Sequence, residues 1–186
     1  MVLIGLLRAV NVGGRNLIRM EALRAICKAL KFRDVQTYVQ SGNVVFKTDA
    51  RDPAPLAGRI EKAIEKSAGF RPSVILRTTA EMRDVIARNP FAGRRDIEPG
   101  KLLVVFLASD PGAAARDAVQ KIKTDPEELR ASGGEVYIYY PGGMGRSKLS
   151  WTGIEKMLKV AGTGRNWNTV TKLLAMAEEL DKEPRA

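Results

Sequence analysis

Apolar and polar positions alternate along this chain with two different periods, which predict a mixture of strands and helices. Residues 2–10 are apolar on both sides, as in a buried strand. From 20 to 30 the apolar side chains recur every three or four positions, which predicts a helix. The runs 35–39 and 43–47 are rich in Val, Thr, Tyr and Phe, and Gln40-Ser41-Gly42 between them predicts a hairpin.

Residues 52–77 complete a first structural half. Asp52 and Pro53 are helix-start signals, and apolar side chains follow them at helical spacing. Residues 73–77 are predicted to form the next strand. The resulting order, strand–helix–strand–strand–helix–strand, is that of a ferredoxin-like split β-α-β fold. We therefore expect residues 1–77 to form a ferredoxin-like half.

Residues 78–186 predict a second, mixed αβ half that packs with the first. Thr78 and Glu81 form a capping-box pattern at the start of a helix. Residues 101–107 are the clearest strand of the chain, and after a further helix a hairpin is predicted over 127–140. Two helices are predicted to close the chain. The fold class is therefore α+β, and the pattern also allows one continuous domain.

The composition narrows the chemistry. The 186 residues are 45% hydrophobic and 28% charged, as in an ordinary globular protein. Histidine is absent, which excludes Ser-His and Cys-His catalysis and imidazole zinc sites. Neither a carboxylate cluster nor a P-loop or dinucleotide fingerprint is present, so we expect no metal and no cofactor. A single cysteine, Cys27, and the lack of a signal peptide or membrane span favour a cytoplasmic protein.

The net charge of +10 is distributed unevenly. Residues 1–50 contain 8 basic and 3 acidic side chains, and residues 141–186 contain 8 and 5. An excess of this kind favours polyanions or phosphorylated small molecules as partners. The alternative is a basic protein whose charge serves only its solubility.

Three glycine-rich stretches run into an arginine and then into a predicted helix: Val12–Asn16, Gly142–Lys148 and Gly162–Trp167. Glycine lets the backbone direct its N–H groups outward, a helix start adds partial positive charge, and arginine adds a forked donor. We therefore predict anion binding in these loops. The candidate ligand-binding residues are Asn11, Gly13, Gly14, Arg15, Asn16, Ser41, Asn43, Arg146, Lys148, Arg165, Asn166 and Trp167.

The candidates in the first half also have a purely structural interpretation. Gly13 and Gly14 are typical of a tight turn that requires positive φ, and Arg15 would then only be solvated. Ser41 and Asn43 are likewise ordinary residues of a hairpin turn.

The third stretch has two interpretations as well. Trp167 either stacks on a base beside a phosphate held by Arg165, or anchors the last helix to the sheet. In both cases we expect Asn166 or Asn168 to cap that helix, and Gly162 to end the helix before it.

Five motifs of the chain resemble the family called domain of unknown function 1697. They are Leu6–Gly14, Thr37–Phe46, Asn89-Pro90-Phe91, Tyr140–Leu149 and Gly164–Val170, in the order typical of the family and over nearly the whole chain. One difference is Ala9, at a position where the family commonly has glycine. The resemblance implies a small bacterial α+β protein with no established activity.

We expect a non-hydrolytic binding protein, monomeric or homodimeric, that holds a phosphorylated small molecule or a nucleic-acid backbone in a basic cleft. Arg15, Arg146, Lys148 and Arg165 would supply the charge. One alternative is a transferase that handles phosphate without histidine, through positioning and charge stabilisation. Another is a protein-interaction module that uses the basic first helix. The sequence does not decide whether the protein is an enzyme, and it does not favour a membrane partner.

Overall fold

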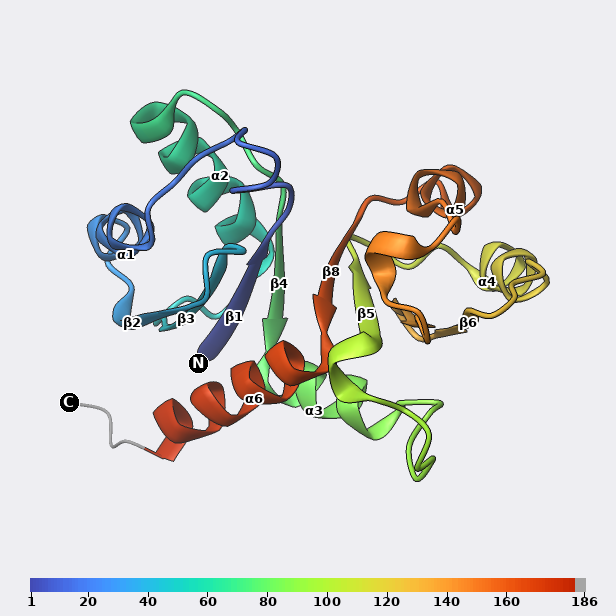
Figure 1. The fold of residues 1–186 in the computed structure, drawn as a ribbon. Coiled ribbons are helices and arrows are strands. Elements are labelled where there is room, and N and C mark those ends of the chain that lie inside the picture. Colours follow the sequence, from blue (N-terminus) through green and yellow to red (C-terminus); the bar gives the residue numbers. More distant parts are fainter. Residues whose placement is uncertain (183–186) are drawn as a thin grey trace. The chain divides into compact units, whose positions relative to one another are not determined.

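The computed structural model describes residues 1–182, and the chain divides into two compact units (Figure 1). The first unit consists of Met1–Arg83 and the segment from Lys172 onward, and the second is Asp84–Thr171. Each unit contains a four-stranded antiparallel sheet with helices. The fold is therefore α+β, as predicted from the sequence.

The elements of the first unit follow the order that the hydrophobic pattern predicts. They are β1 (Val2–Leu7), α1 (Met20–Ala29), β2 (Arg33–Tyr38), β3 (Asn43–Lys47), α2 (Ala54–Ala68) and β4 (Val74–Thr78). The strands lie in the order β2-β3-β1-β4, and every neighbouring pair is antiparallel.

The core of the first unit lies between its sheet and the helices α1 and α2. Leu3 and Leu7 of β1 belong to one buried cluster with Leu23 and Cys27 of α1 and Ile60 of α2. All residues of β1 are buried, which explains why its sequence is apolar at successive positions and does not alternate.

Two helices cross from one unit to the other along the chain. Helix α3 (Thr79–Ala87) begins in the first unit, and α6 (Trp167–Lys182) ends in it. The capping box predicted for α3 is confirmed, because the Thr78 N–H donates to Glu81 Oε2 at 2.7 Å and the Glu81 N–H donates to Thr78 Oγ1 at 3.2 Å. Within residues 1–182, none of the helices has the length and apolar character needed to cross a membrane.

The second unit repeats the element order of the first. Its elements are η1 (Pro99–Lys101), β5 (Leu102–Leu107), α4 (Ala113–Gln120), β6 (Glu128–Ser132), β7 (Glu135–Tyr139), η2 (Met144–Arg146), α5 (Trp151–Leu158) and β8 (Gly162–Asn166). The strand order β6-β7-β5-β8 corresponds strand for strand to β2-β3-β1-β4. This repetition was not predicted, because its last strand, β8, is not recognisable in the sequence.

Strand β8 corrects the prediction of a glycine-rich loop at Gly162–Asn166. It pairs with β5 in antiparallel register, with Gly162 opposite Leu107. A Cβ atom on Gly162 would lie 2.7 Å from Val105 Cγ1 and 2.8 Å from Trp151 Cζ2. Glycine is therefore present because large side chains cross over this strand. Helix α5 ends instead at Lys159, which is left-handed with φ 54°.

The two units differ in the connections at one end of each sheet. In the first unit, residues 8–19 join β1 to α1, and residues 39–42 join β2 to β3. The equivalent connections in the second unit are shorter, residues 108–112 and Gly133-Gly134. The longer connections of the first unit contain seven of the candidate ligand-binding residues or border on them.

Candidate functional site

The two long connections of the first unit lie side by side at one end of its sheet (Figure 1). Leu6 near the end of β1 pairs with Asn43 at the start of β3, and Asn43 pairs with Tyr38 at the end of β2. The segments that follow β1 and β2 therefore leave the sheet at the same end. We call residues 8–19 and 39–42 together the tip.

Gly13 and Gly14 form the turn of a miniature hairpin within the tip. Both have positive φ, 57° and 74°, which is the backbone of a type I′ turn. The Arg15 N–H donates to the Val12 carbonyl at 3.1 Å, and the Asn11 N–H donates to the Asn16 carbonyl at 3.1 Å. These two donors are therefore used inside the hairpin and do not point to a ligand.

The position of this turn relative to α1 corrects the sequence analysis. Helix α1 begins only at Met20, and its N-cap is Arg19, which has extended backbone and makes no side-chain cap. The partial charge of the helix start therefore does not reach Gly13 and Gly14, because that effect is confined to the first turn. The prediction that this loop combines glycine turn and helix terminus is wrong.

The carboxamide of Asn11 joins the two segments of the tip. Its Nδ2 donates to the Gln40 carbonyl at 2.7 Å and to the Ile18 carbonyl at 3.0 Å, and its Oδ1 accepts from the Ile18 N–H at 2.9 Å. Asn16 adds a shorter-range bond from Nδ2 to the Ala9 carbonyl at 3.0 Å. Asn11 and Asn16, both predicted as ligand contacts, therefore hold the loop in shape.

Several residues of the tip have a backbone conformation that non-glycine residues rarely adopt. Ala9, Asn11, Asn16 and Val39 have φ between 50° and 55°. A positive φ is unusual for alanine and a marked outlier for a β-branched residue such as Val39. Such residues are found where the surrounding structure imposes them, and they gather at binding sites.

The hairpin turn supports the tip through a buried asparagine and a glycine. Asn43 is fully buried and donates from Nδ2 to the Tyr38 carbonyl at 2.9 Å and to Ser41 Oγ at 3.0 Å. Gly42 has φ 75°, and a Cβ atom there would lie 2.4 Å from Val10 Cγ2. The alternation of strand and turn residues predicts the turn, but no local pattern indicates the close approach of Gly42 to Val10.

The tip is basic and partly apolar on its outside. Arg8, Arg15 and Arg19 lie in or next to it, whereas residues 1–20 and 35–48 contain no Asp or Glu. Arg15 is exposed, and the described residues provide it with no ion pair. Val12 and Leu17 are each 65% exposed. The tip thus presents both charge and hydrophobic surface to solvent.

The second glycine-rich stretch lies in the loop between β7 and α5. Gly143 has φ 84°, and its N–H donates to the Tyr140 carbonyl at 2.9 Å. Arg146 and Lys148 are exposed. Helix α5 starts after this loop, at Trp151, with Ser150 as its cap. This stretch therefore provides two exposed cations, but it does not run directly into an α-helix.

The third stretch buries its arginine. Arg165 in β8 is 6% exposed, and its Nη1 donates to Thr163 Oγ1 at 2.9 Å and to the Gly164 carbonyl at 2.8 Å. Burial lowers the pKa of this guanidinium to about 10. The expected exposed clamp is therefore a buried group that bonds to its own strand.

The residues after Arg165 start helix α6. Asn166 Oδ1 accepts from the Thr169 N–H at 2.9 Å, so the predicted helix cap is confirmed. Trp167 is half-buried at the first position of α6. Since Tyr139 pairs with Leu102 and Asn166 with Leu103, the ends of β7 and β8 lie at the same end of the second sheet. Within that unit, the start of the second stretch and the end of the third therefore lie at one sheet end.

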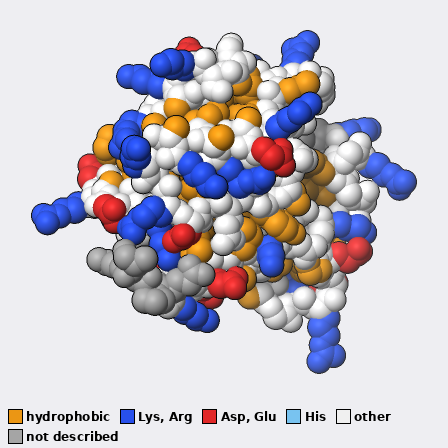
Figure 2. Space-filling model, turned by 90° about the vertical axis from the view of Figure 1, so that its left-hand side faces the viewer, with side chains coloured by type: hydrophobic (Ala, Val, Ile, Leu, Met, Phe, Trp, Pro, Cys, Tyr) orange, Lys and Arg blue, Asp and Glu red, His pale blue; other side chains and the backbone are white. Residues whose placement is uncertain are grey.

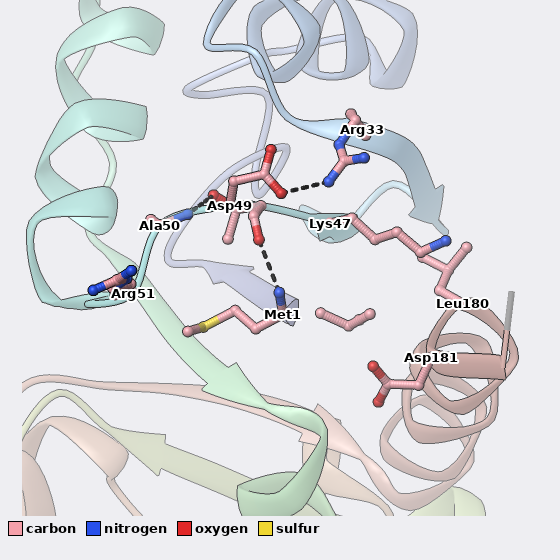
Figure 3. A pocket seen from close by; sticks show the side chains of 10 residues that line it. Met1, Arg33, Lys47, Asp49, Ala50, Arg51, Leu180 and Asp181 are labelled. Carbon is pink, nitrogen blue, oxygen red and sulfur yellow. Dashed lines mark hydrogen bonds and ion pairs between the residues drawn. The ribbon is translucent and has the colours of Figure 1, made fainter. Parts of the chain in front are cut away.

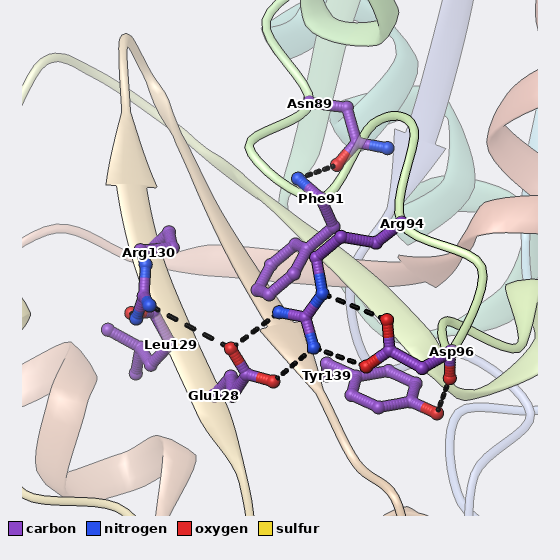
Figure 4. Close-up of polar contacts among 8 residues, drawn as sticks. All are labelled: Asn89, Phe91, Arg94, Asp96, Glu128, Leu129, Arg130 and Tyr139. Atoms are coloured by element: carbon purple, nitrogen blue, oxygen red, sulfur yellow. Dashed lines mark hydrogen bonds and ion pairs between the residues drawn. The ribbon is translucent and has the colours of Figure 1, made fainter.

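Arg94 of the second unit is surrounded by polar and charged partners from the same unit (Figure 4). Arg94 Nη1 lies 2.7 Å from Glu128 Oε2 on β6, its Nε donates to Asp96 Oδ1 at 3.1 Å, and its guanidinium lies over the Phe91 ring. The hydrogen bond from Arg94 lowers the pKa of both carboxyl groups. Its charge is satisfied by its neighbours, so this cluster fastens the loop before η1.

The charge of the whole molecule does not by itself locate a site. On the face drawn in Figure 2, Lys and Arg side chains are spread among hydrophobic and neutral ones and do not form one continuous patch. Among the described residues, no three His, Cys, Asp or Glu side chains are grouped so that they could hold a metal ion. The candidate site therefore depends on the local features of the tip.

Comparison with known proteins identifies the family. The family model described as "Protein of unknown function (DUF1697)" matches residues 1–137, so the chain belongs to this family. No curated protein matches the chain. Among solved structures, the conserved bacterial protein SP0830 from Streptococcus pneumoniae has the same fold, with a TM-score of 0.70 and 22% sequence identity. The match covers 95% of this chain and 98% of that one.

Proposed function

We propose that this is a binding protein whose tip holds the phosphate groups of an anionic ligand, with a nucleic-acid backbone as the ligand class. The observation that carries the proposal is the charge of the tip. Arg8, Arg15 and Arg19 lie in or next to the tip, and Arg15 is exposed and has no ion pair among the described residues. Arginine forms forked hydrogen bonds to phosphate oxygens, and positive charge attracts polyanions over long distances.

The rigidity of the tip supports the proposal. The bonds of Asn11 and Asn16, together with the type I′ turn, fix the backbone on both sides of Arg15. A preorganised loop loses little conformational freedom when a ligand binds.

The exposure of the tip favours a polyanion over a small phosphorylated molecule. Residues 12–17 are all exposed, and a Cβ atom on Gly13 or Gly14 would have no neighbour within 4 Å. Small ligands are usually held in concave pockets, whereas nucleic-acid backbones are bound on exposed basic surfaces. Arg146 and Lys148 of the second unit are further exposed cations that a polyanion could contact.

The test compares two charge reversals that change the net charge equally. Arg15→Glu alters the tip, and Lys156→Glu alters an exposed position of α5 in the second unit. Binding of a fluorescently labelled single-stranded oligonucleotide and of its duplex is measured by anisotropy at low salt. We expect Arg15→Glu to weaken binding by about tenfold or more, because each phosphate contact contributes directly to affinity. Equal affinities of the two variants, or no binding at low salt, would contradict the proposal.

Protein docking is a second candidate for the tip, and the exposed apolar side chains favour it. Val12 and Leu17 are 65% exposed and Val39 is 49% exposed. Exposed apolar side chains next to basic ones are typical of protein contacts. A Leu17→Ser variant separates the two functions, because it should leave oligonucleotide affinity unchanged and abolish capture of a protein partner.

A further inference from the structure

Three of the four edge strands carry side chains that bond to their outward-facing backbone groups. Strands β2 and β4 form the edges of the first sheet, and β6 and β8 form those of the second. An edge strand presents N–H and C=O groups with which a strand of another chain can pair. The partners of these groups therefore decide whether a further strand can add to the sheet.

The ladder between β1 and β4 shows which groups of β4 face outward. The Arg8 N–H donates to the Ser73 carbonyl at 2.8 Å, and bonded pairs alternate with non-bonded pairs in an antiparallel ladder. Every second residue from Ser73 onward therefore bonds to β1. The residues between them, Val74 and Leu76, direct their backbone groups away from the sheet, where a further strand would pair.

Two side chains occupy these outward groups of β4. Glu61 Oε1 on α2 accepts from the Val74 N–H at 3.0 Å. Arg77 Nη1 donates to the Leu76 carbonyl at 3.0 Å. Val74 is only 5% exposed although it belongs to an edge strand. The carboxylate and the guanidinium therefore take the places that the backbone of an added strand would need.

Strand β8 repeats this arrangement in the second unit. The Ala161 carbonyl accepts from the connection after β5 at 2.9 Å, so Gly162 and Gly164 face outward by the same alternation. Glu155 Oε1 on α5 accepts from the Gly162 N–H at 2.9 Å. Arg165 Nη1 donates to the Gly164 carbonyl at 2.8 Å. A helix glutamate and a strand arginine thus occupy corresponding places in the two units.

The outward groups of β6 follow from the two ladders of β7. The Leu107 N–H donates to the Gly134 carbonyl at 3.0 Å, so every second residue from Gly134 onward bonds to β5. The residues between them bond to the even-numbered residues of β6. Leu129 and Ala131 of β6 therefore face outward.

Both outward carbonyls of β6 accept a hydrogen bond from a side chain. Arg130 Nη1 donates to the Leu129 carbonyl at 2.8 Å (Figure 4). Gln120 Nε2 on α4 donates to the Ala131 carbonyl at 3.1 Å. Leu129 is only 3% exposed. In β6, as in β4 and β8, an arginine bonds to the outward carbonyl of the residue before it.

Strand β2 is interrupted in a different way. Its register with β3 shifts between Arg33 and Gln36, and Asp34 within the shift has φ 51°. Such a bulge bends an edge strand and interrupts its pairing. At this end of the sheet, opposite the tip, the strand ends and the last turns of α6 line a cavity of about 500 Å³ (Figure 3). There Arg33 Nη2 lies 2.5 Å from Asp49 Oδ1, which fastens the start of β2 to the segment after β3.

We infer that the side chains bonded to β4, β6 and β8 are edge caps, which prevent strands of other chains from adding to the two sheets. An arginine bonded to the preceding carbonyl is common to the three strands, and a helix glutamate completes the cap in β4 and β8. The inference is independent of the proposed function. It implies that a partner uses a surface such as the tip and not a sheet edge.

The first test opens the edge of β6. The double variant Gln120→Ala/Arg130→Ala removes both side-chain donors. Arg95→Ala, at an exposed loop position, removes the same charge away from the edge strands. Sedimentation velocity is measured over a wide range of protein concentration. We expect the double variant to self-associate at least about tenfold more strongly than Arg95→Ala, because two freed carbonyls can each gain a hydrogen bond from another chain.

A proline substitution shows whether this association uses strand pairing. The Ala131 N–H faces outward and takes no part in the ladder with β7, so Ala131→Pro leaves the sheet intact. Added to the double variant, it removes a donor that an incoming strand needs. We therefore expect Ala131→Pro to abolish the association.

The second test concerns the glutamate of β4. Glu61→Ala removes the acceptor of the Val74 N–H, whereas Glu61→Gln removes the same charge and keeps a side-chain oxygen. Both lose the ion pair with Arg71, so the comparison excludes its contribution. Amide exchange of Val74, followed by NMR, should be at least about tenfold faster in Glu61→Ala than in Glu61→Gln. Only Glu61→Ala should self-associate.

Thermal unfolding checks the fold of each variant, and the Glu61 pair keeps the test decisive if the double variant unfolds. A folded double variant that sediments like Arg95→Ala at every concentration would overturn the inference. So would an association that Ala131→Pro leaves unchanged, or equal sedimentation of the two folded Glu61 variants. In those cases the side-chain bonds serve the stability of each unit alone.

Discussion

The two units share one strand order but use the same end of their sheets differently. In the second unit the two connections are short and consist of Gly133-Gly134 and residues 108–112. In the first unit, the equivalent connections form the tip, which is anchored by buried Val10 and Ile18 and cross-linked by Asn11. Since the second unit has the same topology without such a structure, the fold does not require the tip. Its additional residues are therefore available for binding.

The largest expected effect concerns the glycine of each hairpin. Gly42→Ala should destabilise the protein by about 3 kcal/mol, because positive φ is strained for alanine and the new Cβ would lie 2.4 Å from Val10 Cγ2 and 2.8 Å from Leu7 Cβ. Gly133→Ala should cost about 1 kcal/mol, because positive φ is strained for alanine and its Cβ would meet only the end of one long side chain, Arg88, at 3.1 Å. Urea unfolding measures both.

The comparison of the units depends on this difference. Equal losses at the two glycines would mean that the hairpin of the first unit is not held more tightly than the minimal one of the second. The tip would then not be the preorganised structure that the proposed function needs.

A smaller effect is expected from the asparagines of the tip. Asn11→Ala should lower the free energy of unfolding by about 2 kcal/mol, because the carbonyls of Gln40 and Ile18 and the Ile18 N–H lose their partner. Asn16→Ala removes one exposed bond to Ala9 and should cost less than about 1 kcal/mol. Urea unfolding and oligonucleotide binding are measured for both.

The binding readout separates structure from function in the tip. Asn11→Ala should weaken oligonucleotide binding even where the protein remains folded, since Arg15 is no longer held in place. A folded Asn11→Ala variant with wild-type affinity would show that the cross-link between the two segments serves stability alone.

The smallest effect is expected in the second unit, where Arg94 is satisfied internally. Its hydrogen bond lowers the pKa of Glu128 below the usual value. A lowered folded-state pKa stabilises the protein above the unfolded pKa of about 4, and this stabilisation is lost as the pH falls through the folded value. Arg94→Gln should therefore lower the urea midpoint slightly at neutral pH and not at all in strong acid. A difference that persists in acid would contradict the ion-pair explanation.

The sequence analysis predicted elements better than it predicted contacts. Local signals such as the Thr78–Glu81 capping box and the Asn166 cap are complete within a few residues, so they could be recognised directly. Strand β8 could not, because Gly162 is explained only by the side chains of Val105 and Trp151, and Gly164 only by that of Leu103. Burial in the candidate site could not be predicted either, because the spacing of glycine and arginine does not indicate that Arg165 is buried.

The amino-acid sequence by itself determined the α+β class, the order of elements in the first unit, the basic excess and the lack of histidine chemistry, because these follow from composition and local periodicity. Only the tertiary structure decided the duplication of the strand order and the Asn11 cross-link. It also decided which basic side chains come together at the tip, and it formed the cavity at the opposite end of the sheet. These features depend on which distant segments pair, and pairing is selected by the packing of the whole unit and not by any short stretch of chain.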